Sequence, residues 1–259
     1  MKRTLFIVIG LLLSVALSAQ QFEPMEYDGL PYQQLSSNID GAEKPTLVLF
    51  LHGGHARGED NQKQIQLQAV KDIKNYILKN NIPAYFLVPQ CPGDMEWIPN
   101  RGATGCKDKL LGLIREYADE KGINPSRIYL CSVSMGSWAS WVLVKENPDL
   151  FAAAFIASGN HKGVSPEQLT GTPLYITVGS RERSLDAIKW MAGEILKAGG
   201  TAKFDTLTGC DHPKACDKAF TDKRLEWLFE QKKTANHRRS HLVVHLPAGD
   251  VHPVQRHQS

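Results

Sequence analysis

Short runs of apolar residues alternate along the chain with longer segments in which apolar residues recur every three or four positions. Continuous apolar runs predict strands buried on both faces, and the recurring pattern predicts helices that cover them. The expected strands are residues 46–51, 84–88, 127–131, 151–157, 174–178 and 203–207. The expected helices are residues 61–80, a segment around 110–117 that stops at Gly122, residues 134–145, a segment capped by Ser184 and stopped by Gly199, and residues 218–232.

This alternation indicates the α/β class, with a mostly parallel sheet that carries helices on both faces. The length of 259 residues, without an internal repeat or a linker, favours one domain over residues 20–234. Residues 1–19 resemble a signal peptide, because Lys2 and Arg3 precede an apolar run that ends in Ser18 and Ala19. We therefore expect a secreted or periplasmic protein with no stable membrane anchor after cleavage.

Residues 235–259 form a tail of a different kind, which holds five of the nine histidines at irregular spacing. We expect this tail to be disordered and to bind no metal. The net charge of +3 comes from the two ends, since the body between them carries 25 basic and 26 acidic residues. This balance gives no reason to expect a nucleic-acid partner, and the sequence does not reveal the oligomeric state.

The five cysteines allow disulfides if the protein is exported, although an odd number leaves one thiol unpaired. Cys131 lies in an apolar run and is expected to be the buried free thiol. Cys210 with Cys216 is the first candidate pair, and Cys91 with Cys106 is the second. No CxxC spacing supports a zinc site.

Three expected strands end in residues suited to catalysis. His52-Gly53-Gly54-His55 follows the first, and its glycines leave backbone N–H groups uncovered. Ser132-Val133-Ser134-Met135-Gly136 stands between a strand and a helix, as a nucleophile elbow does, with Ser132 at the usual first glycine. An ordinary helix cap at Ser134 is the alternative. His212 follows the last strand, in the chain order serine, acid, histidine.

Two acidic residues follow the fifth expected strand. Asp186 falls in the first turn of a helix, where the helix dipole favours an acid in any case. Glu182 lies in the loop, between Arg181 and Arg183, which would keep it ionised. Loop position favours Glu182 as the triad acid and leaves Asp186 as the alternative.

Several segments in this order resemble secreted α/β-hydrolase esterases, in particular the polyhydroxybutyrate-depolymerase and feruloyl-esterase-like group, which overlaps with proteins described as phospholipase/carboxylesterase. The resemblance spans about residues 30–230 and rests on LPY (30–32), LVLFLHGGHARGEDN (47–61), PQCP (89–92), IYLCSVSMGSW (128–138), NPDLFAAAFIASG (147–159) and TLTGCDH (206–212). It implies a triad of Ser134, Glu182 and His212, with Gly54 and Met135 supplying oxyanion N–H groups. The sequence departs from the family pattern at two positions. Ser132 replaces a glycine, and Glu182 replaces the usual aspartate.

These residues predict a serine carboxylic-ester hydrolase that works through an acyl-enzyme and needs no cofactor. The resemblance suggests small-molecule esters or acyl esters of plant polysaccharide as substrates. The alternatives are a serine peptidase of related fold and an inactive hydrolase shell that binds carbohydrate. Trp97 and Trp138 are candidate substrate-binding residues, whereas Trp138 and Trp141 together are equally compatible with core packing.

Overall fold

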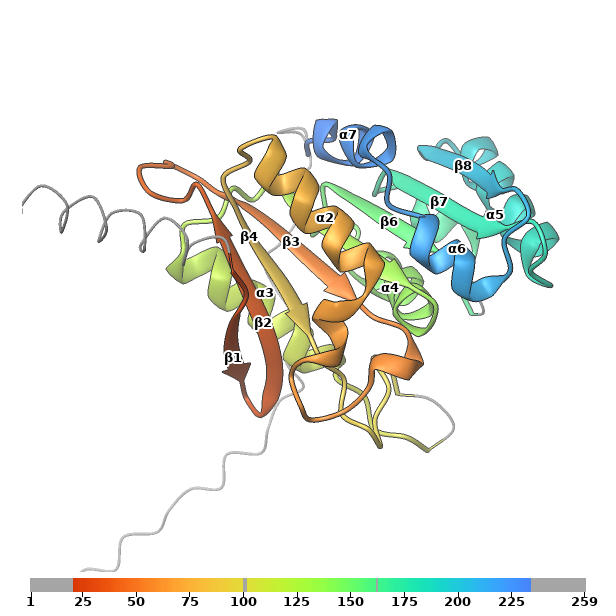
Figure 1. The fold of residues 1–259 in the computed structure, drawn as a ribbon. Coiled ribbons are helices and arrows are strands. Elements are labelled where there is room, and N and C mark those ends of the chain that lie inside the picture. Colours follow the sequence, from red (N-terminus) through yellow and green to blue (C-terminus); the bar gives the residue numbers. More distant parts are fainter. Residues whose placement is uncertain (1–20, 100–101, 162, 234–259) are drawn as a thin grey trace, which may run out of the picture.

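The computed structural model describes residues 21–99, 102–161 and 163–233, and eight strands in this part form one sheet (Figure 1). The strand order is β1-β2-β4-β3-β5-β6-β7-β8. Strands β3 to β8 pair in parallel, whereas β2 pairs antiparallel with β4, and β1 pairs antiparallel with β2 at the edge of the sheet. The bounds are β1 Glu23–Tyr27, β2 Leu30–Ser37, β3 Thr46–Leu51, β4 Ala84–Pro89, β5 Ile128–Val133, β6 Ala153–Ala157, β7 Leu174–Gly179 and β8 Ala202–Leu207.

Helices cover both faces of the sheet, as the sequence predicts. One face carries α2 (Gln68–Lys79), α6 (His212–Lys218) and α7 (Asp222–Glu230), and the other carries α3 (Lys107–Glu120), α4 (Met135–Glu146) and α5 (Leu185–Lys197) (Figure 1). Short 3-10 helices span Gly54–Ala56 (η1), Lys63–Gln66 (η2) and Pro166–Leu169 (η3).

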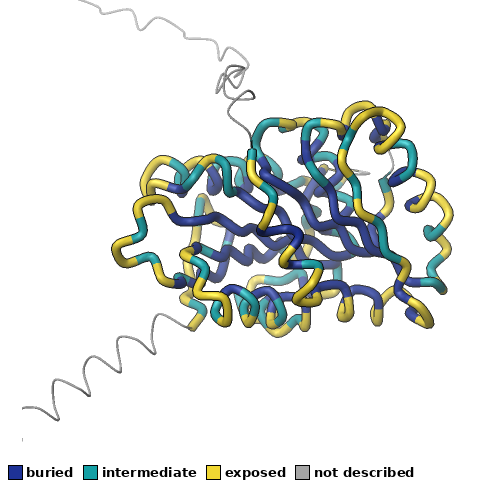
Figure 2. Tube along the Cα trace, turned by 90° about the horizontal axis from the view of Figure 1, so that it is seen from above, coloured by how far each residue is buried: buried dark blue, intermediate teal, exposed yellow. Residues whose placement is uncertain are grey.

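The strands separate two apolar cores, because successive side chains of a strand point to opposite faces. In β3, Leu47 and Leu49 pack with the core under α3, α4 and α5, while Val48 and Phe50 pack with the core under α2, α6 and α7. The central strands are buried between the two helical layers (Figure 2). This double burial explains why their sequences read as continuous apolar runs.

The six strands expected from the sequence lie within two residues of their predicted bounds, and the structure corrects three other expectations. Strands β1 and β2 are additional, and their mixed polar sequences carry no apolar run. The helix expected over 61–80 begins at Gln68, because Leu67 is extended and η2 precedes it. The helix expected over 218–232 is the shorter α7, which begins at Asp222 because the chain is extended at Thr221, and the separate helix α6 ends at Lys218.

The expected signal peptide (1–19) lies outside the described residues. So does the expected histidine-rich tail (235–259). Among the residues that are described, no helix is long and apolar enough to cross a membrane.

All five cysteines lie in the described part of the chain as free, buried thiols. Neither candidate bridge is therefore formed in this structure, since Cys91 and Cys106 are unbonded and so are Cys210 and Cys216. Cys210 and Cys216 pack in different apolar clusters, Cys210 with Leu207 and Cys216 with the core under α2, α6 and α7. Cys131 is buried as predicted.

Candidate active site

Ser134 lies in a sharp turn between β5 and α4, with backbone angles φ 54° and ψ −116°. This left-handed conformation is strained for a residue with a side chain and is the geometry expected of a nucleophile elbow. The turn also needs Gly136, because a Cβ there would lie 2.0 Å from the carbonyl oxygen of Leu51. The first elbow position tolerates Ser132, whose hydroxyl is fully buried and contacts the Ser137 Oγ at 3.2 Å.

The hydroxyl of Ser134 does not cap the helix that it precedes. Instead, Ser134 Oγ lies 2.8 Å from His212 Nε2, so the hydroxyl can donate its hydrogen to the ring. His212 is held at the start of α6, where the Asp211 side chain accepts a hydrogen bond from the Lys214 N–H. The structure thus brings together two residues that lie 78 positions apart in the sequence.

The other ring nitrogen of His212, Nδ1, donates to Glu182 Oε2 at 2.7 Å. Glu182 Oε1 accepts two further hydrogen bonds, from Ser158 Oγ at 2.7 Å and from the Gly179 N–H at 2.8 Å. Asp186 is exposed in the first turn of α5 and makes no described contact with His212. Of the two candidate acids, the structure therefore places Glu182 beside the histidine.

The electrostatics of the pair follow from these bonds. Burial raises the pKa of Glu182, but the hydrogen bonds from His212, Gly179 and Ser158 outweigh it and leave the pKa below the ordinary value. The expected source of this effect was Arg181 and Arg183, which the structure leaves exposed. The hydrogen bond to Glu182 raises the pKa of His212 above 6.5.

Gly53 and Gly54, at the start of η1, lie against the elbow. A Cβ on Gly53 would be 3.1 Å from Ser134 Cβ, and one on Gly54 would be 3.9 Å from Met135 Sδ. No described residue accepts a hydrogen bond from the backbone N–H of Gly54 or of Met135. Met135 is the first residue of α4, so its N–H group stands at the N-terminus of that helix, where the helix dipole favours negative charge.

His52 holds the glycine segment from inside the core. Its ring is fully buried, Nδ1 donates to the Gly53 carbonyl at 2.7 Å and Nε2 accepts from the Cys91 N–H at 3.0 Å. Burial lowers the pKa of His52 to about 4, so the ring is neutral near pH 7. His52 is therefore a residue that positions the Gly53-Gly54 segment. The sequence analysis identified it only as part of the HGGH motif.

The tryptophans do not form the expected substrate platform. Trp97 is fully buried and donates from Nε1 to the His52 carbonyl at 3.0 Å, so the expectation that it contacts substrate is wrong. Trp141 is also buried and donates to the Gly159 carbonyl at 3.1 Å. Trp138 is half-buried against the core beside Ser134, and it is the candidate substrate residue that stays partly accessible.

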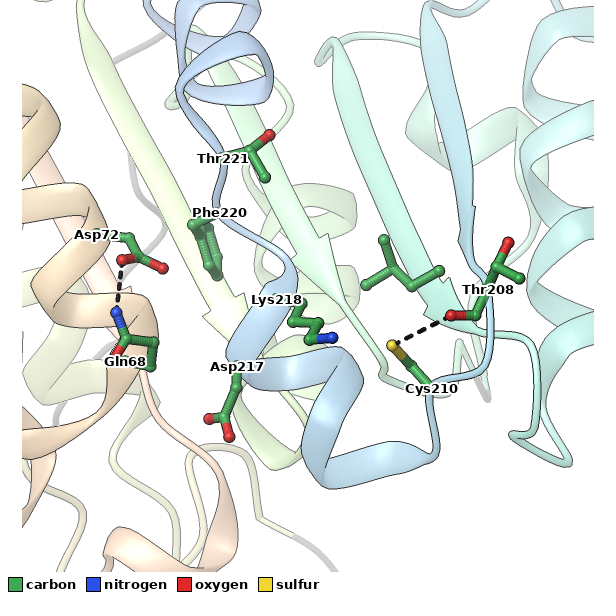
Figure 3. A pocket seen from close by; sticks show the side chains of 9 residues that line it. Gln68, Asp72, Thr208, Cys210, Asp217, Lys218, Phe220 and Thr221 are labelled. Atoms are coloured by element: carbon green, nitrogen blue, oxygen red, sulfur yellow. Dashed lines mark hydrogen bonds between the residues drawn. The ribbon is translucent and has the colours of Figure 1, made fainter.

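A cavity of about 490 Å³ opens between α2, α6 and the end of β8 (Figure 3). It lies away from the serine, and neither Ser134, Glu182 nor His212 lines it. The hydrogen-bonded series, and not this cavity, locates the candidate active site. The cavity is lined by Gln68, Asp72, Leu207, Thr208, Cys210, Asp217, Lys218, Phe220 and Thr221.

Sequence reasoning missed Ser158 as a partner of the acid. Ser158 directly follows β6 and has a positive φ of 56°, which aims its hydroxyl at Glu182. The only sequence signal was its place at the end of a strand, in the segment Ala157-Ser158-Gly159.

No protein-family model matches this sequence, and no curated protein shows significant similarity to it. Among solved structures, the chain is similar to a thermostable esterase, with 24% identity and a TM-score of 0.69 over 82% of this chain and 63% of that protein. The chain thus spans less than two thirds of that esterase. It is also similar to the S-formylglutathione hydrolase of Staphylococcus aureus, with 13% identity and a TM-score of 0.62 over 81% of this chain and 99% of that one. A ferulic acid esterase gives 13% identity and a TM-score of 0.64 over 81% and 97% of the two chains.

These likenesses, together with the parallel sheet and its helical layers, show that the chain has the α/β-hydrolase fold. The fold predicted from the sequence is thereby confirmed. In this fold the ligand site lies where loops follow the carboxyl ends of the strands, which is where Ser134, Glu182 and His212 stand.

Proposed function

We propose that this protein is a serine carboxylic-ester hydrolase that works through an acyl-enzyme. The observation that carries the proposal is the series of hydrogen bonds from Ser134 Oγ through His212 to Glu182, at 2.8 and 2.7 Å. A hydroxyl, an imidazole and a carboxylate in this order form the arrangement that activates a serine for acyl transfer.

The proposed reaction begins when Ser134 Oγ attacks the ester carbonyl carbon and its proton passes to His212 Nε2. Glu182 keeps Nδ1 protonated, which leaves Nε2 free to act as the base, and it stabilises the imidazolium that forms. The N–H groups of Gly54 and Met135 bind the oxyanion of the tetrahedral intermediate, a contribution of about 3 kcal/mol for each such donor in known cases.

The intermediate collapses when His212 gives its proton to the leaving alcohol, which leaves the acyl group on Ser134. Water then attacks the acyl-enzyme, with His212 again as base, and releases the carboxylic acid and the free serine. Every step uses side chains and backbone groups of this chain.

For the substrate, we propose small acyl esters, including those carried on polysaccharide. His212 is 46% exposed, which supports a site open enough for an alcohol that is part of a polymer. The structural likeness to a ferulic acid esterase supports the same class. A panel of short-chain, long-chain and cinnamoyl esters, with peptide amides for comparison, tests this specificity and separates an esterase from a peptidase.

The test of the mechanism is Ser134→Ala with p-nitrophenyl acetate and a fluorophosphonate probe. We expect the variant to keep its Tm, to lose at least about 10⁴-fold in kcat and to escape the labelling that wild type shows at this serine. Ser132→Ala is the matched control and should keep both activity and labelling. Full activity in Ser134→Ala would refute the proposal, and a wild-type protein that neither labels nor turns over esters would favour the inactive shell.

A further inference from the structure

Cys91 and Cys106 face one another in the core beneath the candidate active site. Their sulfur atoms lie 3.9 Å apart, and both residues are almost completely buried in the same apolar cluster. Cys91 follows β4, and Cys106 is the residue before α3. To form a disulfide, the two sulfurs would have to approach from 3.9 Å to about 2.05 Å.

We propose that Cys91 and Cys106 form a disulfide in the mature protein, and that this bond braces the segment that presents the oxyanion N–H groups. The bond itself does not depend on the proposed ester hydrolysis. Only its expected role at the oxyanion segment rests on that function.

The bracing follows from the contacts of the loop that the bond would close. The Cys91 N–H donates to His52 Nε2 at 3.0 Å, and the Cys91 carbonyl accepts from the Gly58 N–H at 3.0 Å. Trp97 Nε1 donates to the His52 carbonyl at 3.0 Å.

Arg57 adds a fourth connection. It donates from Nε to the Gly54 carbonyl at 3.2 Å and from a terminal nitrogen to the Met95 carbonyl at 3.2 Å. Four connections therefore join residues 52–58 to the part of the chain between the two cysteines. A covalent closure of that loop would limit the motion of the glycine segment.

The chemistry of the pair suits thiol–disulfide exchange. The hydrogen bond between the two thiols lowers the pKa of Cys106 against the opposing effect of burial, and Lys109 also lowers it, whereas the same hydrogen bond and burial raise the pKa of Cys91. The oxidant is a small-molecule disulfide such as oxidised glutathione. The Cys106 thiolate attacks one glutathione sulfur and expels the other as a thiolate, which leaves a mixed disulfide.

The Cys91 thiol then gives its proton to the glutathione thiolate released in the first step and attacks Cys106 Sγ, which expels the second glutathione thiolate. The net change oxidises two protein thiols to one disulfide and reduces one glutathione disulfide to two thiols. Because both sulfurs are buried, the exchange takes place before the loop packs or when it opens transiently.

None of the other three cysteines has another cysteine sulfur in contact with its own, as Cys91 and Cys106 do. Cys131 is completely buried in the core, Cys210 Sγ donates to the Thr208 carbonyl at 3.7 Å, and Cys216 packs on the opposite face of the sheet from the Cys91 pair. The geometry thus reverses the order of the two pairs that spacing along the sequence suggested.

The first experiment is disulfide mapping of the full chain, refolded in a buffer of reduced and oxidised glutathione and then alkylated without reduction. We expect a linked Cys91–Cys106 peptide and alkylated Cys131, Cys210 and Cys216. Alkylation of both Cys91 and Cys106, or a link between other cysteines, would overturn the proposal. This result does not depend on any enzymatic activity.

The second experiment measures Tm and hydrogen exchange with and without dithiothreitol. Closing a loop whose ends are 15 positions apart should raise Tm by about 6–12 °C, and reduction should remove that gain. Reduction should also speed exchange in the peptide that holds residues 52–58.

The double variant Cys91→Ala/Cys106→Ala should show no response to dithiothreitol, whereas the control Cys131→Ala should respond as wild type does. Unchanged exchange in residues 52–58 after reduction would overturn the bracing role. If the double variant fails to fold, the wild-type mapping and its response to reduction still decide the question.

Discussion

Replacing Glu182 with glutamine changes one oxygen to an NH₂ group and removes a charge while it keeps the shape of the side chain. The carboxylate accepts three hydrogen bonds, from His212 Nδ1, Ser158 Oγ and the Gly179 N–H. An amide has one acceptor oxygen and one donor group. One of the native donors must therefore face an NH₂ group that also donates.

The arrangement of the three donors decides which orientation the amide takes. If its oxygen replaces Oε1, it keeps the bonds from Ser158 and Gly179, and its NH₂ group faces His212 Nδ1. The ring must then carry its proton on Nε2, which cannot accept the proton of Ser134. The opposite orientation sets the NH₂ group against the Gly179 N–H, which cannot become an acceptor.

We therefore expect Glu182→Gln to lower kcat for p-nitrophenyl acetate by about 10³–10⁴-fold, because the same change of tautomer in a serine-protease triad costs about 10⁴. This loss corresponds to about 4–5.5 kcal/mol of transition-state stabilisation. The assay is steady-state hydrolysis at pH 8, with Asp186→Asn as the matched control. A loss of less than tenfold in Glu182→Gln, or a large loss in Asp186→Asn, would refute the assignment of the acid.

Three further predictions concern the base, the elbow and the core beneath the glycines. Since the pKa of His212 is raised and the neutral ring is the active form, kcat/KM should fall as the pH drops, with its midpoint above pH 6.5 in a pH-rate profile. Gly136→Ala should destabilise the fold by about 3 kcal/mol in urea unfolding, since its Cβ meets Leu51, whereas Gly193→Ala, with open space in a helix, should stabilise it by about 0.5–1 kcal/mol. Trp97→Phe should lose about 1–3 kcal/mol of stability and lower kcat, because a buried carbonyl loses its donor.

Each of these has an outcome that contradicts it. An acid limb with a midpoint below pH 6 would show that Glu182 does not stabilise the imidazolium. Equal stability of Gly136→Ala and wild type would mean that the elbow does not need the close approach to β3. A wild-type kcat in Trp97→Phe would show that the hydrogen bond from Trp97 to the His52 carbonyl does not position the oxyanion segment.

The sequence by itself determined the class of fold and the position of the nucleophile turn. Strands buried on both faces must be apolar throughout, so β3 to β7 stand out as runs, and the Ser134 turn carries its small neighbours within five residues. Strands β1 and β2 escaped notice because an edge position allows polar residues such as Gln33 and Gln34.

Only the tertiary structure decided which acid meets His212, what holds that acid and which cysteines face one another. Glu182 and Asp186 are four residues apart, and the loop after β7 turns one of them toward α6 and leaves the other in solvent. Ser158 and Cys91 reach their partners across the sheet and the loops, at separations of 24 and 15 positions. Contacts of this kind depend on how distant segments pack, whereas apolar periodicity reports only which face of its own element a residue occupies.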